Sequence, residues 1–326
     1  MSRPFNLLLD GQIYTSLPEE TVLDTLLRHK VNVPFSCKKQ TCMSCVLQSL
    51  NGPPPVHAQV NLKDTLQLQN NFLACACIPE RDMEIAVNQE ILTRQVSAHV
   101  VELNWLNPTV LELVLQCETP VDYHGGQLVL LLNYEHIGKK FPIASATSAK
   151  SSGQLTIHVK RKIGAVFSAW IHENLRVDDQ LFICGVSGEL FYVPGHPKQP
   201  LLLTAWDGDL AAMIGVVQDV FEHNHNGPVY LFHSVASSEH LYFSAELNEI
   251  SDFFPNFHYF PCVEHGPTTP QSYQGPVDII IAKTLPNLSH WKIYLCGSRN
   301  QTHSVQKQAY LTGAAMKDIY VEVTSF

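Results

Sequence analysis

The sequence Cys37-Lys-Lys-Gln-Thr-Cys42-Met-Ser-Cys45 places three cysteines on one short stretch, and Phe72-Leu-Ala-Cys75-Ala-Cys77 supplies further thiols 30 positions later. The spacing C-x4-C-x2-C with a distant fourth cysteine is that of a [2Fe–2S] cluster site. Soft sulfur ligands also suit zinc, which is the alternative metal. Structural zinc sites usually show two C-x2-C-like pairs, whereas here four residues separate the first two cysteines and a third cysteine joins them, so the spacing favours iron and sulfide.

The segments around these cysteines resemble a plant-type ferredoxin domain in order and spacing, at residues 20–27, 33–37 and 73–75. The resemblance implies four metal ligands: Cys37, Cys42, Cys45 and Cys75. Cys77 is then a spare thiol, because the last cysteine of the family follows a Leu-x pair.

Two residues of the cysteine loop depart from the family pattern. Gln40 and Met43 stand where ferredoxins usually carry glycine. Those glycines permit positive φ and let backbone N–H groups approach the sulfides. Their replacement is expected to change the potential or strength of the cluster without removing a ligand.

Length and composition indicate a multidomain globular chain. It has 326 residues, 45% hydrophobic and 16% charged, with a net charge of −9 that argues against a nucleic-acid partner. No apolar run is long enough to span a membrane, and no secretory signal is evident at the start. The five cysteines outside the proposed cluster are scattered, as expected of reduced thiols in a cytoplasmic protein. The 16 histidines form no HExxH motif and are interpreted as surface or core residues.

Periodicity divides the chain into three regions. Residues 1–94 contain a hairpin around Asp10-Gly11, an amphipathic helix at 20–29 and a closing strand at 83–87. Residues 95–197 contain short strands that suggest a barrel or sandwich, with one helix at 165–175; the strands are 96–103, 110–115, 128–132, 155–159 and 180–184. Residues 198–326 alternate strands with helices such as 210–221, which indicates a doubly wound parallel sheet; its strands are 201–204, 229–232, 257–260, 277–281 and 292–296.

The whole chain resembles the ferredoxin–NADP reductase superfamily, in particular reductases with an N-terminal ferredoxin module. The resemblance rests on the order of the ferredoxin module, Gly126-Gln-Leu-Val, the stretch 139–145 and the stretch 164–168. It implies a β-grasp-like ferredoxin domain, a Greek-key β-barrel that binds flavin, and a doubly wound nucleotide domain. Members of this group supply electrons to oxygenases and deoxysugar dehydratases.

The resemblance implies an FAD site on the barrel. An aromatic ring at Phe141 can stack on the flavin, Lys139 can pair with phosphate, and the Gly164 turn before a helix offers free N–H groups. Taken singly, these residues are better explained as a core aromatic, a solvated charge and a turn; their order and spacing after a ferredoxin module reverse this and favour flavin. Lys139 replaces an arginine and Pro142 replaces a serine that would bond the flavin. The implied flavin contacts are Lys139, Phe141, Pro142, Ile143, Ala144, Ser145, Gly164, Ala165, Val166, Phe167 and Ser168, with Phe326 as a possible cover.

The stretch Thr204-Ala-Trp-Asp-Gly-Asp-Leu-Ala211 stands where the family has a glycine-rich loop for the nucleotide pyrophosphate. Only Gly208 remains, Trp206 adds bulk, and Asp207 and Asp209 add negative charge. Two like charges about 4 Å apart repel by about 1 kcal/mol even in water, and a helix dipole returns only about 0.3–1 kcal/mol. The loop is therefore predicted to disfavour NAD(P)H.

The end of the chain follows the family more closely. Cys296 and Gly297 resemble the Cys-Gly-Pro loop beside nicotinamide and flavin, and Glu322 matches a carboxylate that some members use there. Cys296 and Glu322 are the catalytic candidates. The alternative interpretation is that Cys296 is a buried structural thiol and Glu322 a surface charge.

Three modules in one chain imply a linear electron path from NAD(P)H through flavin and [2Fe–2S] to a protein acceptor, an oxygenase or a dehydratase. The alternative is an electron-transfer or accessory protein with the same fold that has lost efficient NAD(P)H oxidation. The loop at 204–211 and Pro142 motivate that alternative.

Overall fold

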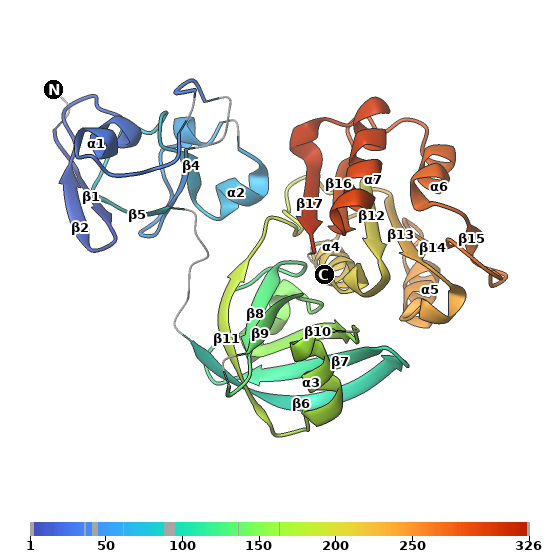
Figure 1. Ribbon diagram of the computed structural model, residues 1–326. Coiled ribbons are helices and arrows are strands. Elements are labelled where there is room, and N and C mark those ends of the chain that lie inside the picture. Colours follow the sequence, from blue (N-terminus) through green and yellow to red (C-terminus); the bar gives the residue numbers. More distant parts are fainter. Residues whose placement is uncertain are drawn as a thin grey trace. The chain divides into compact units, whose positions relative to one another are not determined.

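The computed structural model describes residues 3–35, 37–40, 45–60, 62–87, 95–135, 137–162 and 164–324. The chain forms two compact units, Met1–Ile91 and Leu92–Phe326, each of which is considered separately (Figure 1). In the part of the chain that is described, no helix is both long and apolar enough to cross a membrane.

The first unit is a five-stranded sheet in the order β2-β1-β5-β3-β4. Its strands are β1 (Asn6–Leu9), β2 (Gln12–Thr15), β3 (Val46–Ser49), β4 (Asn71–Leu73) and β5 (Met83–Val87), and its helices are α1 (Val22–Arg28) and α2 (Asp64–Leu68). Asp10 and Gly11 both have positive φ, as a tight hairpin turn requires. The Thr21 side chain accepts from the Asp24 N–H and so caps α1. The predicted hairpin, helix and closing strand are confirmed.

The second unit contains an antiparallel sheet in the order β10-β7-β6-β11-β8-β9. Its elements are β6 (Val96–Asn107), β7 (Val110–Cys117), β8 (Leu128–Leu132), β9 (Gly138–Pro142), β10 (Gln154–Lys160), β11 (Gln180–Ser187) and α3 (Val166–Asn174). A bridge between Ile143 and Ile157 joins the two edge strands, which closes the sheet into a barrel. The barrel prediction is confirmed, although β9 was not among the predicted strands because its sequence does not alternate.

The same unit contains a parallel sheet in the order β15-β14-β13-β12-β16-β17. Its strands are β12 (Leu201–Trp206), β13 (Val229–Val235), β14 (Phe257–Val263), β15 (Tyr273–Gln274), β16 (Lys292–Gly297) and β17 (Ile319–Val323). Its helices are α4 (Leu210–Glu222), α5 (Ser244–Phe253), α6 (Val277–Thr284) and α7 (Arg299–Leu311). All residues of β12 and β16 are buried, as in a sheet covered on both faces. The strand order reverses between β12 and β16, which is where such sheets bind ligands.

One predicted strand is wrong. Residues 277–281 form the start of helix α6 rather than a strand. A short apolar run does not distinguish a strand from a buried helical segment. Here Val277, Ile280 and Ile281 are buried at helical spacing, Pro276 precedes the first turn, and the two-residue strand β15 takes the sheet edge instead.

The barrel and the parallel sheet are tied together at helix α4. A Cβ on Gly215 would lie 2.5 Å from the Ile143 carbonyl oxygen, so glycine is needed for this close approach. The buried Asp219 carboxylate accepts hydrogen bonds from the N–H groups of Thr147 (2.6 Å) and Gly125 (3.2 Å). These contacts fix the barrel against the carboxyl edge of the parallel sheet, where the candidate site lies.

Candidate functional site

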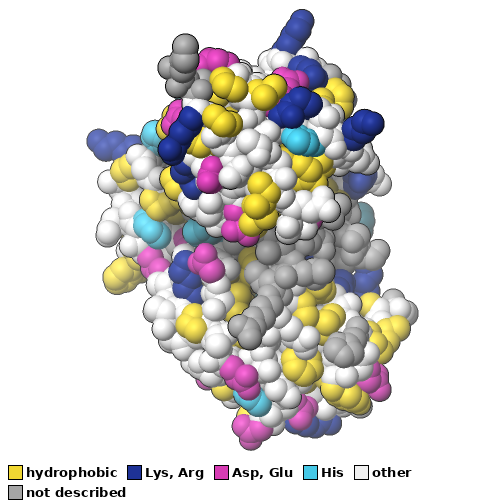
Figure 2. Space-filling model, turned by 90° about the vertical axis from the view of Figure 1, so that its left-hand side faces the viewer, with side chains coloured by type: hydrophobic (Ala, Val, Ile, Leu, Met, Phe, Trp, Pro, Cys, Tyr) yellow, Lys and Arg dark blue, Asp and Glu magenta, His cyan; other side chains and the backbone are white. Residues whose placement is uncertain are grey.

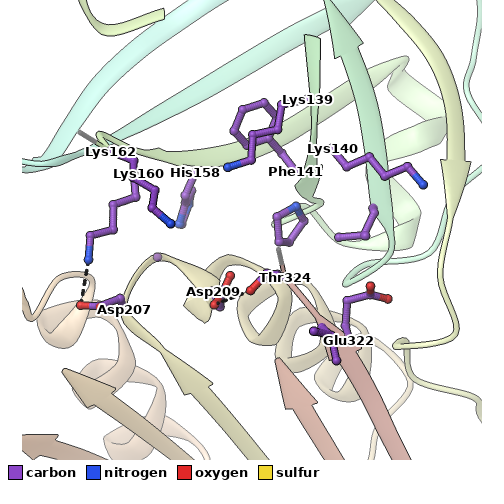
Figure 3. Close-up of a pocket in the computed structure, with 14 residues that line it drawn as sticks. Lys139, Lys140, Phe141, His158, Lys160, Lys162, Asp207, Asp209, Glu322 and Thr324 are labelled. Atoms are coloured by element: carbon purple, nitrogen blue, oxygen red, sulfur yellow. Dashed lines mark hydrogen bonds and ion pairs between the residues drawn. The ribbon is translucent and has the colours of Figure 1, made fainter. Parts of the chain in front are cut away.

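A cavity of about 540 Å³ lies where strands β9 and β10 of the barrel face the carboxyl edge of the parallel sheet (Figure 3). Its volume is within the range of pockets that hold cofactors and drug-sized ligands. The lining residues are Leu128, Lys139, Lys140, Phe141, Pro142, His158, Lys160, Lys162, Asp207, Gly208, Asp209, Glu322, Val323 and Thr324.

The barrel side of the cavity combines an aromatic ring with cations. Phe141 is almost fully buried and packs against Phe167, with ring centroids 6.0 Å apart. The Lys139 amino group lies 5.9 Å from the centroid of the Phe141 ring. Burial lowers the pKa of Lys139, and the nearby Lys162 ammonium lowers it further. An apolar ring framed by ammonium groups suits a planar ligand that carries negative charge.

The opposite side of the cavity carries carboxyl groups (Figure 3). Asp209 is only 3% exposed, and its Oδ2 accepts a hydrogen bond of 3.0 Å from the Thr324 hydroxyl. Burial raises the pKa of Asp209 to about 7, and burial likewise raises the pKa of Glu322 to about 7. Both groups therefore exchange protons near neutral pH, which suits proton transfer inside a cavity.

Trp206, the last residue of β12, and the 3₁₀ turn η3 (Asp207–Asp209) that forms the loop after it make close contacts with neighbouring elements. Trp206 packs so closely on Gly297 that a Cβ there would lie 2.5 Å from the indole ring. Asp207 has a φ of +49° and forms an ion pair of 2.9 Å with Lys160 across the cavity.

Two buried side chains bind the carbonyl groups of this loop. The His233 Nε2–H donates to the Asp207 carbonyl at 3.2 Å, and the Tyr242 hydroxyl donates to the Gly208 carbonyl at 3.3 Å. A Cβ on Gly208 would lie 2.8 Å from the Cβ of Lys160, so this glycine makes room for the lysine. The loop after β12, which takes the position of the family's pyrophosphate loop, is thus packed against the barrel and the parallel sheet.

Several predicted site residues do not line the cavity. Ile143 is buried in the barrel core, Ala144 is buried in the core of the parallel sheet, and the Ser145 hydroxyl accepts from the Thr156 N–H at 3.1 Å. The predicted motif 164–168 begins α3 outside the cavity, where the buried Ser168 hydroxyl donates to the Ala165 carbonyl. These contacts leave the predicted flavin roles of these residues as predictions.

Cys296 is fully buried at the end of β16, where burial raises the pKa of its thiol well above the usual range. It contributes to the core of the parallel sheet and does not line the cavity. Phe326 lies outside the described residues.

The structure adds cavity residues that sequence reasoning missed: Lys140, His158, Lys160, Lys162 and Thr324. Alternation along β10 was the available signal, because residues two apart on a strand share a face. His158 and Lys160 are two apart and both line the cavity. Thr324 carried no such signal, because its position depends on the meeting of strand β17 with the loop after β12.

The described cysteines of the first unit differ in their surroundings. Cys37 is half-buried, and its sulfur accepts a hydrogen bond of 3.3 Å from the Lys39 N–H. Cys45 is joined to the segment of Cys75 through a 2.9 Å hydrogen bond from the Ala74 N–H to the Cys45 carbonyl. Cys42 lies outside the described residues, and within them no three Cys, His, Asp or Glu side chains form a metal-binding group.

The spare thiol Cys77 is fully buried in the core of the first unit. Burial raises the pKa of Cys77 to about 12.

Two family models match this chain. The 2Fe-2S iron-sulfur cluster binding domain matches residues 8–80, and the oxidoreductase NAD-binding domain matches residues 210–307. The chain is 27% identical to the phenol hydroxylase P5 protein of Acinetobacter pittii, over 93% of this chain and 89% of that one. It is 26% identical to the CDP-6-deoxy-L-threo-D-glycero-4-hexulose-3-dehydrase reductase of Yersinia pestis, over 88% of each chain.

The chain therefore carries a 2Fe-2S iron-sulfur cluster binding domain and an oxidoreductase NAD-binding domain, and its fold is that of the ferredoxin–NADP reductases. It shares the fold of the Amycolatopsis cytochrome P450 reductase GcoB, with a TM-score of 0.68 and 23% identity over 98% of both chains. A ferredoxin reductase of carbazole 1,9a-dioxygenase shares that fold with a TM-score of 0.66 and 20% identity, also over 98% of both. The match to the NAD-binding model begins at Leu210, directly after the packed loop.

Proposed function

We propose that this reductase takes electrons from NAD(P)H and passes them through FAD and a [2Fe–2S] cluster to a protein acceptor. The observation that carries the proposal is the cavity between the barrel and the carboxyl edge of the parallel sheet. The relatives named as phenol hydroxylase and hexulose dehydrase components support an oxygenase or a deoxysugar dehydratase as the acceptor. Within the second unit, we assign residues 95–197 to flavin and 198–326 to the nucleotide.

The cavity fits a flavin by the chemistry of its lining. Phe141 offers a ring face, and Lys139, Lys160 and Lys162 offer positive charge for phosphate oxygens. A bound flavin would accept electrons as a hydride and release them singly. Pro142 supplies neither an N–H nor a hydroxyl, so proton exchange in the cavity falls to Asp209 and Glu322.

For the cluster we propose Cys37, Cys42, Cys45 and Cys75 as ligands. The hydrogen bond from the Lys39 N–H to the Cys37 sulfur supports this assignment, because such bonds stabilise thiolate charge and tune cluster potentials. We leave Cys77 out of the set because Cys75, not Cys77, follows the Leu-x pair of the ferredoxin pattern; the Cys77 thiol is fully buried.

A second candidate function is an electron-transfer or accessory protein that oxidises NAD(P)H poorly. The packed loop favours it: Trp206 occupies the space beside Gly297, and Asp207 and Asp209 bring carboxylates to the strand-order reversal. In many nucleotide sites this position offers free backbone N–H groups to a pyrophosphate. Here the loop carbonyls are bound by His233 and Tyr242.

The two candidates are separated by NADH and NADPH oxidation, measured with ferricyanide as acceptor on flavin- and cluster-loaded protein. The reductase proposal requires turnover with at least one nucleotide in the ordinary enzyme range, above about 1 s⁻¹. Slower turnover with both nucleotides favours the accessory protein.

Variants of Asp207 test whether the charge of this loop weakens nucleotide binding. Asp207→Asn removes the charge but keeps the side-chain size, and Asp207→Gly also removes the side chain from a position with φ of +49°. Loss of about 1 kcal/mol of repulsion is expected to lower the nucleotide KM about five-fold. An unchanged KM in both variants would exclude the charge of Asp207 as the obstacle.

A further inference from the structure

The segment that carries the cysteine loop is purely cationic. Residues 25–63 contain five basic residues and neither aspartate nor glutamate, although the whole chain has a net charge of −9. The basic residues are Arg28, Lys30, Lys38, Lys39 and Lys63. Charge of one sign beside the proposed cluster sets the electrostatic character of the surface that meets an acceptor.

Two of these cations are neutralised within the unit. Arg28 forms a bidentate pair with Glu20, with Nε and Nη2 each 2.8 Å from a carboxylate oxygen. The Lys38 amino group lies 2.7 Å from Asp24 Oδ1. The Lys38–Asp24 pair joins the cysteine loop to helix α1, and the net charge of both pairs at the surface is small.

Lys30 and Lys39 remain as uncompensated charges. Both are exposed, and among the described residues neither lies within ion-pair distance of a carboxylate. Lys39 follows Cys37 by two positions and its backbone N–H bonds the Cys37 sulfur, so its side chain projects from the loop that bears the first ligand. Lys30 ends the turn after α1, with a φ of +61°.

An exposed aromatic ring lies beside Lys38 in the same segment. Phe35 is 44% exposed and precedes Cys37 by two positions. The Lys38 amino group lies 5.5 Å from the centroid of the Phe35 ring. Aromatic side chains are enriched at protein interfaces. The face drawn in Figure 2 carries hydrophobic, basic and acidic side chains.

We propose that Lys30, Phe35 and Lys39 form a basic docking face for an acidic surface of the electron-accepting protein. The proposal rests on the proposed role of the cluster as the last station of the electron path. A single electron leaves the reduced cluster and reduces the acceptor by one electron, with no proton or atom transferred. Redox partners bind through small interfaces and rely on complementary charge for fast encounter, which a few uncompensated lysines beside the donor provide.

The test uses two haem proteins of opposite charge, acidic cytochrome b5 and basic cytochrome c, as one-electron acceptors. The cluster is reduced chemically with dithionite, so that the outcome does not depend on NAD(P)H oxidation. Stopped-flow spectroscopy gives the second-order rate constant for each cytochrome with wild-type protein and with the double variant Lys30→Gln/Lys39→Gln. The matched control is Lys307→Gln/Lys317→Gln, which removes two exposed charges from the second unit.

At about 10 mM ionic strength, the Lys30/Lys39 variant is expected to reduce cytochrome b5 about ten-fold more slowly than wild type, and the control about as fast. The difference should vanish near 1 M salt, where the Debye length is about 3 Å. The midpoint potential and visible spectrum of the cluster should be unchanged, which places the effect in docking.

Equal, salt-independent rates of wild-type protein with both cytochromes would overturn the docking face. So would an equal loss in the control variant. Either result leaves the reductase proposal standing, because NAD(P)H oxidation with ferricyanide decides that proposal separately.

Discussion

The cysteine loop and the loop after β12 have both lost glycines that the family carries, and they have lost them with different consequences. In the cysteine loop, Lys38 and Gln40 adopt φ values of +52° and +61°, and the Lys39 N–H still donates to Cys37. In the loop after β12, Asp207 adopts a φ of +49°, but the loop carbonyls and side chains bind neighbouring protein groups. Both backbones reach the left-handed region without glycine.

The difference lies in which atoms hold the ligand. A cluster is held by cysteine sulfur, so the loop keeps its proposed function as long as the thiolates converge. A pyrophosphate is held by free backbone N–H groups and a favourable dipole, so added bulk and negative charge act on the binding atoms themselves. Loss of glycine is therefore tolerated where side chains are the ligands and is costly where the backbone is the ligand.

The largest expected effect tests the side-chain half of this comparison. Cys75→Ala should abolish the visible absorption of the cluster and its iron content after anaerobic reconstitution. Cys77→Ala is the matched control and should retain both, because its thiol is buried in the apolar core. Loss of the cluster in the Cys77 variant with retention in the Cys75 variant would reverse the ligand assignment.

The second-largest expected effect concerns Asp209 in the loop after β12. Burial raises the pKa of Asp209 from 3.8 to about 7, so the folded protein binds this proton more tightly than the unfolded chain. The group therefore costs stability progressively as pH rises from about 4 to 7, by up to about 4 kcal/mol. Asp209→Asn, which keeps an acceptor for Thr324, should equal wild type near pH 4 and exceed it in free energy of unfolding at pH 8.

Denaturant unfolding at the two pH values measures the effect. Asp252→Asn is the control, since its exposed side chain stays in water. A pH-independent difference between Asp209→Asn and wild type would mean that Asp209 is already ionised in the folded protein.

The sequence predicted most of the fold, because hairpin turns, alternation and helical spacing are local signals. Examples are the Asp10-Gly11 turn and helix α1. Helix α6 was predicted as a strand because the run 277–281 is apolar throughout, and only its packing in three dimensions separates the two possibilities.

The sequence predicted the site residues that belong to a motif, but not those whose position depends on contacts between distant parts of the chain. Phe141, Lys139, Gly208 and Glu322 were predicted from motifs, and all line the cavity. The hydrogen bond from Thr324 to Asp209 joins residues 115 positions apart, and no local sequence pattern predicts it. Trp206 was predicted to add bulk, but its packing on Gly297 required the adjacency of β12 and β16.

The smallest expected effect tests the claim that left-handed backbone without glycine is tolerated in the cysteine loop. A residue with a side chain costs roughly 1–2 kcal/mol more than glycine in this region. Gln40→Gly should therefore strengthen the loop by about 1 kcal/mol and slow the loss of the cluster to a chelator about five-fold. Lys39→Gly is the matched control one position away, where φ is not positive, and it should speed that loss by increasing the freedom of the unfolded loop. If both variants lose the cluster faster than wild type, the Gln40 side chain stabilises the loop by more than its left-handed backbone costs. The loop would then tolerate the loss of glycine for a reason other than ligation by side chains.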